Sequence, residues 1–111
     1  MFSPAPSISC LVHHKLLAVR DPLLNSGFRP YPTTALIFGA SNGDNGYIMF
    51  YRSSALAKEA ARRWVAEQQK QIGIPNLRVP GVRQTVANVV IDWLAGPRTP
   101  SSRRLVTGCL S

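Results

Sequence analysis

The sequence predicts an α+β fold, with the element order α-β-β-α-β-β-α and a four-stranded antiparallel sheet that has its helices packed on one face. Two short runs rich in β-branched and aromatic residues are joined by a turn, and a second pair of such runs follows later. An amphipathic segment separates the two pairs. Two hairpins with a helix between them favour a single sheet covered by helices. At 111 residues, we expect one domain over 1–111.

The composition indicates a folded and basic chain. Hydrophobic residues make up 45% and charged residues 16% of the sequence, which excludes an intrinsically disordered chain. Thirteen Lys and Arg face five Asp and Glu, so the net charge is +8. Such a charge attracts anionic partners, namely nucleic acid, acidic lipid surfaces or acidic proteins, although small basic proteins without such a partner are also common.

No segment of the sequence predicts a membrane span or a leader. The longest apolar runs are far shorter than the ~20 residues that a spanning helix requires. The first ten residues have neither the basic nor the apolar region of a signal peptide. We therefore expect no transmembrane segment, and either a cytoplasmic protein or a chain whose leader has been lost.

The N-terminal region is predicted to be a loose lead-in followed by a helix. Residues 1–7 carry two prolines and are expected to be irregular. Ser7 is an acceptable N-cap, and the apolar positions after it have helical spacing to about Val19. Asp21-Pro22 then ends the helix.

The next segment is predicted to be a β-hairpin. Its strands are Ala35–Gly39 and Tyr47–Tyr51, which are rich in aromatic and β-branched residues. Residues 40–46 between them are mostly Asn, Asp, Gly and Ser, and Asn, Asp and Gly tolerate the positive φ that a chain reversal demands.

Serine hydrolase and nucleotide-binding motifs are both excluded at this turn. Residues 39–43 match the G-x-S-x-G pattern, but that motif requires a helix after the serine and a histidine later in the chain. Both histidines, His13 and His14, precede Ser41, and the next segment is strand-like. A phosphate-binding glycine loop must also open a helix. Asp92, which we expect to point outward, has no second carboxylate near it in sequence, so we predict no enzyme activity.

The clearest helix in the sequence follows the first hairpin. Ser53 or Ser54 caps it, and it runs from Ala55 to about Gln71, where Gly73 ends it. Its predicted buried stripe consists of Leu56, Ala60, Ala61, Trp64, Val65 and Gln68.

A second hairpin and a last helix complete the fold. The strands Val82–Val86 and Val89–Leu94 meet at Ala87-Asn88, and alternation places Asp92 on the face opposite Trp93. Thr99 is predicted to cap the last helix and Pro100 to take its first position. The apolar stripe of that helix is Leu105, Val106, Cys109 and Leu110.

The two cysteines, Cys10 and Cys109, lie near opposite ends of the chain. In an oxidising compartment they could form a disulfide, which would stabilise the fold by about 4 to 5 kcal/mol. The alternative is two separate buried thiols. A third interpretation is a zinc site made by Cys10, His13, His14 and Cys109. Structural zinc sites, however, usually contain paired Cys-x-x-Cys or His-x-x-x-His spacings, which this sequence lacks. We therefore predict no metal, and the sequence predicts no cofactor.

Basic residues form the candidate anion-binding set. Some lie on the central helix, and others cluster at the start of the last helix. If they converge, contacts with phosphates are their simplest use. The alternative is a solvated surface with local ion pairs, and no aromatic motif typical of RNA binding accompanies them. The set is Lys58, Arg62, Arg63, Arg98, Arg103 and Arg104.

The chain resembles small extracytoplasmic domains of unknown function from high-GC Gram-positive bacteria. The resemblance implies a compact domain whose two terminal cysteines pair outside the cell, and it implies no catalytic residues. It rests on Cys10-Leu11, Asp21-Pro22, Asn88-Val89-Val90-Ile91-Asp92-Trp93, Pro97, Pro100, Arg103 and Cys109-Leu110.

Two functions therefore compete at this stage. The first is a non-enzymatic binding or accessory domain that acts on a protein partner outside the cytoplasm, with Cys10 and Cys109 paired. The second is a cytoplasmic basic domain that binds nucleic acid or an acidic protein. The sequence does not distinguish oligomeric states.

Overall fold

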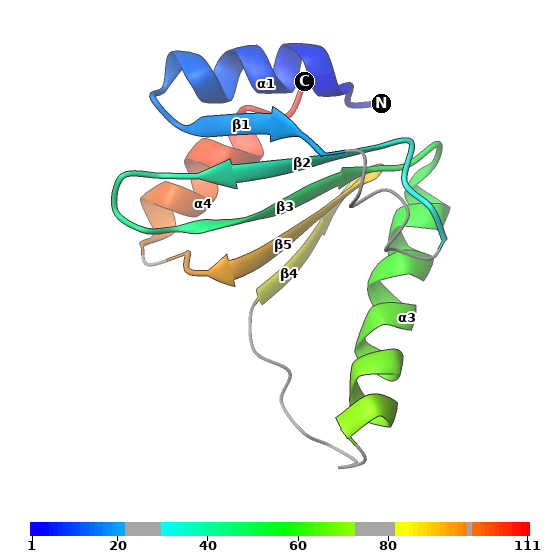
Figure 1. Ribbon diagram of the computed structural model, residues 1–111. Helices are drawn as coiled ribbons and strands as arrows, with labels where there is room; N and C mark the ends of the chain where they lie inside the picture. The colour runs from blue at the N-terminus through cyan, green and yellow to red at the C-terminus, as the bar shows by residue number, and fades with distance from the viewer. Residues whose placement is uncertain (22–29, 73–81, 98) are drawn as a thin grey trace.

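A computed structural model describes residues 1–21, 30–72, 82–97 and 99–111 (Figure 1), and it confirms the α+β class. Among the described helices, none is both long enough and apolar enough to cross a membrane. The elements in chain order are α1 Pro4–His13, β1 Leu17–Arg20, β2 Thr34–Gly39, β3 Asn45–Phe50, α3 Ser54–Ile72, β4 Val82–Val86, β5 Val89–Ala95 and α4 Pro100–Gly108, with side chains in α3 described only as far as Arg63.

The sheet has five strands in the order β1-β2-β3-β5-β4, and every neighbouring pair is antiparallel. The predicted number of four was one too few. The additional strand, β1, occupies residues that the sequence assigned to the first helix. It pairs with β2 from Leu17 opposite Gly39 to Arg20 opposite Leu36. Because this partner strand is distant in the sequence, local helical spacing does not reveal the pairing.

The first helix ends at His13, earlier than predicted, because the backbone reverses at Lys15. This residue adopts a left-handed φ of 65°. The Leu16 N–H then donates to the Leu11 carbonyl at 3.0 Å, and the Lys15 N–H donates to the Val12 carbonyl at 2.9 Å. These two bonds form a Schellman motif, in which glycine usually takes the left-handed position. The sequence has no glycine there, so no stop signal is visible.

The first helix also starts earlier than predicted. It begins at Pro4, inside the segment 1–7 that was expected to be irregular. Proline suits the first helical position because the missing N–H has no helical partner there. The turn of chain before the helix is held in place as well, since the Ser3 N–H donates to the Ser111 carbonyl at 2.6 Å.

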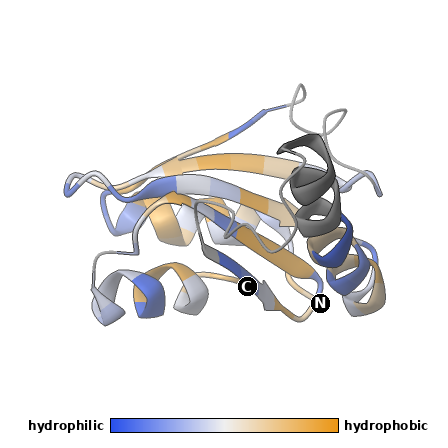
Figure 2. Cartoon of the chain, turned by 90° about the horizontal axis from the view of Figure 1, so that it is seen from below, coloured by the Kyte–Doolittle hydropathy of each residue, from blue (hydrophilic) through white to orange (hydrophobic). Residues whose placement is uncertain are grey.

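Helices cover both faces of the sheet rather than one, as Figure 1 shows. The core on one face joins the sheet to α1 and α4, and it contains Trp93 together with Leu11 and Val106. The core on the other face joins Val90 to Ala57 of α3. Because neighbouring residues of β5 are apolar on both faces, each face requires a cover. Figure 2 shows the hydrophobic residues concentrated along the strands.

Both predicted hairpins are confirmed. β2 and β3 are joined by a turn in which Gly43 has a φ of 93°, and the Asn42 Oδ1 accepts a hydrogen bond from the Asp44 N–H at 3.0 Å. β4 and β5 are joined at Ala87-Asn88, where Ala87 has a φ of 50°. Residues 40–44 therefore form the turn, β3 already begins at Asn45 rather than at Tyr47 as predicted, and no helix opens there.

The caps of the later helices also agree with the sequence. The Ser53 Oγ accepts from the Leu56 N–H at 3.1 Å at the start of α3, and the Thr99 Oγ1 accepts from the Ser102 N–H at 3.2 Å at the start of α4. The predicted stripe of α3 was wrong at Leu56, which is 38% exposed, because the helix turns Ala57 toward the sheet instead. The side chains of the predicted stripe members Trp64, Val65 and Gln68 are outside the described part of α3, and the predicted stop at Gly73 lies outside the described residues.

Candidate functional site at the joined chain ends

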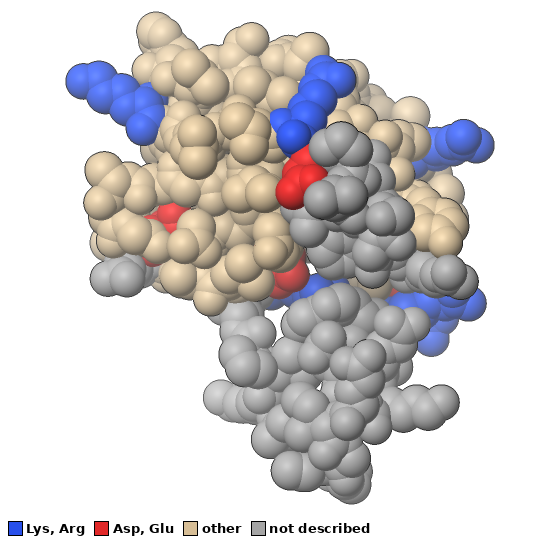
Figure 3. All heavy atoms as spheres, viewed as in Figure 1, with Lys and Arg blue, Asp and Glu red and all other residues tan. Residues whose placement is uncertain are grey.

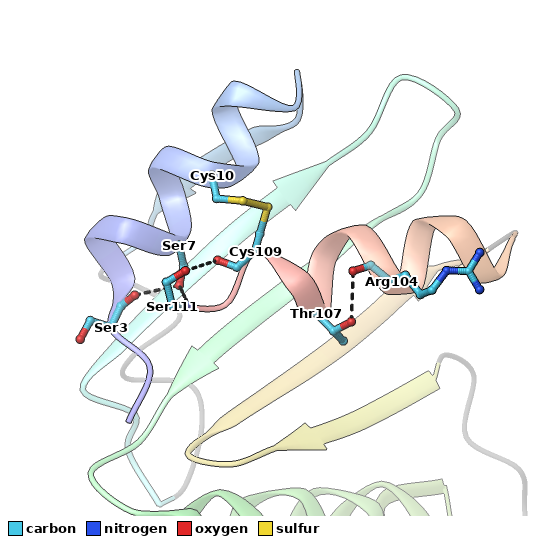
Figure 4. Close-up of a disulfide and its surroundings, with 7 residues drawn as sticks. All are labelled: Ser3, Ser7, Cys10, Arg104, Thr107, Cys109 and Ser111. Carbon is cyan, nitrogen blue, oxygen red and sulfur yellow. Dashed lines mark hydrogen bonds between the residues drawn. A yellow bond between two sulfur atoms is a disulfide. The ribbon is translucent and has the colours of Figure 1, made fainter.

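The two ends of the chain meet beside α1, as Figures 1 and 4 show. The Ser7 Oγ–H donates to the Ser3 carbonyl at 2.8 Å, and the Ser111 N–H donates to the Ser7 Oγ at 3.1 Å. Ser7 is fully buried, so its hydroxyl, which takes part in both bonds, is shielded from water. The first turn of α1 and the last residue of the chain are therefore fixed against each other.

Cys10 and Cys109 form a disulfide across this junction, as one interpretation of the sequence predicted (Figure 4). Their Cα atoms are 5.3 Å apart, and 99 positions separate them in sequence. Cys109 is buried and Cys10 is half-buried. In the chain-entropy model, closing a loop of this size stabilises the folded state by about 4.7 kcal/mol.

His14 completes a cluster of metal-ligating groups beside the disulfide. One ligand atom each of Cys10, His14 and Cys109 lies within 4.8 Å of the others. His14 is the C-cap of α1 and follows Cys10 by four residues, about one helical turn, so the two lie on the same side of the helix. His13, the other histidine considered in the sequence, packs its ring edge to face against His14 at 5.4 Å. In the disulfide state, neither sulfur is a thiolate, and thiolate is the form that binds metals.

The candidate anion-binding residues lie on two different parts of the molecule. Lys58, Arg62 and Arg63 are on α3, whereas Arg103 and Arg104 are on α4, which covers the opposite face of the sheet. The sixth member, Arg98, lies outside the described residues. Figure 3 shows basic side chains spread around the edge of one face rather than gathered in a patch. The structure therefore does not bring these residues together.

Two of these arginines have acidic neighbours, as the sequence alternative anticipated. Glu59 accepts from Arg62 at 2.7 Å and pairs with Arg63 at 3.0 Å. The hydrogen bond from Arg62 lowers the pKa of Glu59. Because all three side chains are substantially exposed, these pairs add little stability. Binding of anions by this set stays a prediction.

The expectation that Asp92 points outward was wrong. Asp92 is buried in an ion pair. Its Oδ2 lies 3.1 Å from the Arg83 Nη2, and the two side chains are 4% and 11% exposed. Burial raises the pKa of Asp92, and the neighbouring Arg83 opposes that rise. The signal was present in the sequence, because a two-residue turn at Ala87-Asn88 places Arg83 directly opposite Asp92.

Tyr51 is a third buried polar group near this pair. Burial raises its pKa to about 12, whereas the positive charge of Arg83 lowers it. Burial also lowers the pKa of Arg83 to about 10, so the guanidinium remains charged at neutral pH. The ion pair of Arg83 and Asp92 links β4 to β5 on the face that α3 covers. It places two charges where an apolar contact would otherwise lie.

A scan against protein-family models, a search of curated proteins and a search of solved structures each found no match to this chain.

Proposed function

We propose that the chain is a non-enzymatic binding or accessory domain that acts outside the cytoplasm on a protein partner. The observation that carries this proposal is the disulfide between Cys10 and Cys109, which closes nearly the whole chain into one loop. Disulfides persist in oxidising compartments and are rare in the reducing cytoplasm. Small secreted domains use them because their cores are limited in size.

The binding surface that we propose lies on β1 at the edge of the sheet. Val19 is opposite Ile37, and Ile37 is two residues from Ala35, which packs in the core beneath α3. Residues that are directly opposite or two apart share a face of a sheet. Leu17 and Val19 therefore lie on the face of α3, and they are 61% and 45% exposed.

The charges around this surface favour an acidic partner. Lys15 is exposed two positions before Leu17, and Arg20 is exposed at the end of the strand, where alternation turns it to the other face. The whole chain has a net charge of +8. An apolar centre with a basic rim is complementary to a protein surface with an apolar centre and an acidic rim. We infer that such a protein docks on β1.

Thiol trapping tests the compartment. A membrane-permeant alkylating reagent is added to intact cells that express the chain, and the mass of the protein is then measured. We expect Cys10 and Cys109 to stay unmodified unless a reductant is added first. Alkylation of both cysteines in untreated cells would contradict the proposed location.

A crosslinking experiment tests the surface. A photoreactive residue at Val19, on the proposed surface, should capture an acidic protein of the same compartment, and purified complexes then give the affinity. Because the surface is apolar at its centre, Leu17→Glu should weaken binding by about tenfold or more. Val12→Glu, at a position on α1 that is 53% exposed, is the matched control and should leave the affinity unchanged. Equal affinities for the two variants, or no captured protein, would refute docking on β1.

A further inference from the structure

We propose that reduction of the Cys10–Cys109 disulfide creates a zinc site, in which Cys10 Sγ, Cys109 Sγ and a ring nitrogen of His14 bind the ion. The fourth position is taken by water. The disulfide would then have two states, a covalent bridge under oxidising conditions and a zinc bridge under reducing conditions. This inference is independent of the partner surface proposed above.

The distances between the three groups suit zinc. The ligand atoms already lie within 4.8 Å of one another. Zinc binds sulfur at about 2.3 Å and imidazole nitrogen at about 2.0 Å, so tetrahedral ligand atoms lie about 3.5 to 3.8 Å apart. Once the sulfur–sulfur bond is broken, the sulfurs separate and the His14 ring needs to move by about 1 Å. Rotation about side-chain bonds supplies a movement of that size.

The junction holds the three groups together without the disulfide. The Ser3 N–H still donates to the Ser111 carbonyl, and the Ser111 N–H still donates to the Ser7 Oγ. Leu11 follows Cys10 and Leu110 follows Cys109, and both leucines are buried in the same core. Reduction therefore leaves two thiols close together on a fixed backbone.

The chemistry of the ligands also favours zinc. Thiolate and imidazole are its preferred ligands, and two thiolates exactly neutralise the charge of one Zn²⁺ when the imidazole is neutral. A neutral complex avoids placing net charge beside the buried Cys109. His14 is exposed, so the ion has a path from solvent and the fourth position is open to water.

The redox step is a thiol–disulfide exchange with a dithiol reductant. One thiolate of the reductant attacks a sulfur of the Cys10–Cys109 bond, and its second thiol resolves the mixed disulfide. Two electrons pass to the protein sulfurs, the reductant becomes a disulfide, and the protein gains two thiol protons. Zinc then displaces these two protons and is itself neither oxidised nor reduced.

The test is a zinc titration of the full chain in both redox states, in competition with a chromophoric chelator. A phosphine reduces one sample under anaerobic conditions, and the other keeps its disulfide. We expect one zinc per reduced chain, release of two protons, and affinity at least about a hundredfold above that of the oxidised chain. Cobalt as a probe should give sulfur-to-metal charge-transfer bands in the reduced chain only.

Variants separate a three-ligand site from simple binding by two thiols. His14→Ala should weaken zinc binding by about tenfold or more, whereas the matched control His13→Ala should bind as the wild type does. Equal binding by both variants would overturn the assignment of His14. Equal binding by oxidised and reduced wild type would overturn the site itself. If the reduced chain unfolds, zinc should restore its circular dichroism and its thermal transition, and failure to do so would also overturn the proposal.

Discussion

Asn88 and Phe2 exchange two hydrogen bonds although 86 positions separate them in sequence. The Phe2 N–H donates to the Asn88 Oδ1 at 2.9 Å, and the Asn88 Nδ2 donates to the Phe2 carbonyl at 3.1 Å. The same Nδ2 also donates to the Tyr51 carbonyl at 2.9 Å. One buried turn residue therefore connects the N-terminus, the end of β3 and the second hairpin.

Replacement of this side chain should be costly. We expect Asn88→Ala to lower the free energy of unfolding by about 2 to 4 kcal/mol, because three hydrogen bonds are lost and their partners, in half-buried Phe2 and buried Tyr51, stay largely shielded from water. Urea unfolding measures the effect. Asn45→Ala is the control, since Asn45 is exposed and its side chain donates to the Gly43 carbonyl at 3.4 Å. A shared urea midpoint for the two variants would show that the Asn88 bonds contribute nothing.

Lys15→Gly should stabilise the protein. Lys15 has a φ of 65°, a conformation that is strained for residues with a Cβ atom and free of strain for glycine. We expect a gain of about 0.5 to 1 kcal/mol, measured by thermal or urea unfolding. His13→Gly, two residues earlier and within α1, should instead cost about 0.5 to 1 kcal/mol. A loss of stability in both variants would contradict the strain assigned to Lys15.

Gly46 is required by a close approach of two backbones. A Cβ atom at Gly46 would overlap the Asp92 carbonyl oxygen on the neighbouring strand. Gly46→Ala should therefore destabilise the fold by about 1 to 3 kcal/mol, because β3 and β5 have to separate. Gly108→Ala is the matched control, since no heavy atom lies within 4 Å of its added Cβ, and it should be neutral or slightly stabilising. Calorimetry on the two variants decides the matter.

The buried pair of Arg83 and Asp92 predicts a non-additive pair of substitutions. Arg83→Met should cost about 3 to 5 kcal/mol, because it leaves a buried carboxylate without its charged partner. The double variant Arg83→Met/Asp92→Leu should recover most of that loss, since neither charge is then buried. A double-mutant cycle in urea measures the coupling. Additive losses would show that the two side chains do not act as a pair.

Tyr51 should make the fold sensitive to alkali. Because burial raises its pKa from 10.0 to about 12, the folded state keeps a proton that the unfolded state loses in this window. The contribution of Tyr51 to the free energy of unfolding therefore falls as pH rises from about 10 toward 12, whereas Arg83, whose pKa burial lowers to about 10, contributes with the opposite sign. Tyr51→Phe should lessen that fall, measured as the melting temperature against pH.

The neutral-pH behaviour of the same variant is a second check. The Tyr51 hydroxyl is buried and makes no hydrogen bond to the residues that the structure describes. Tyr51→Phe should therefore be neutral or stabilising at pH 7, within about 1 kcal/mol. Tyr31→Phe, which alters an exposed phenol, is the control for the alkaline series. If the melting temperature of Tyr51→Phe falls with rising pH as steeply as that of the wild type, Tyr51 is not the cause of the loss of stability in alkali.

Local signals in the sequence were sufficient for the two hairpins and for the caps of α3 and α4. Asn and Gly in residues 40–46, the two-residue turn at Ala87-Asn88 and the cap at Thr99 each act over a few positions. Their partners are neighbours in the chain, so the interactions that they make are available as soon as the local backbone forms. The availability of Cys10 and Cys109 for a bridge was also readable, although their contact was not.

The tertiary structure decided the rest. β1 is a strand because β2 offers it hydrogen bonds, and α3 lies on its own face because both faces of β5 are apolar. The position of His14 beside Cys109 depends on the contact of the two chain ends. Each of these outcomes joins residues that are far apart in sequence, and their energies arise only when the chain closes on itself. Periodicity within one segment contains no information about such partners.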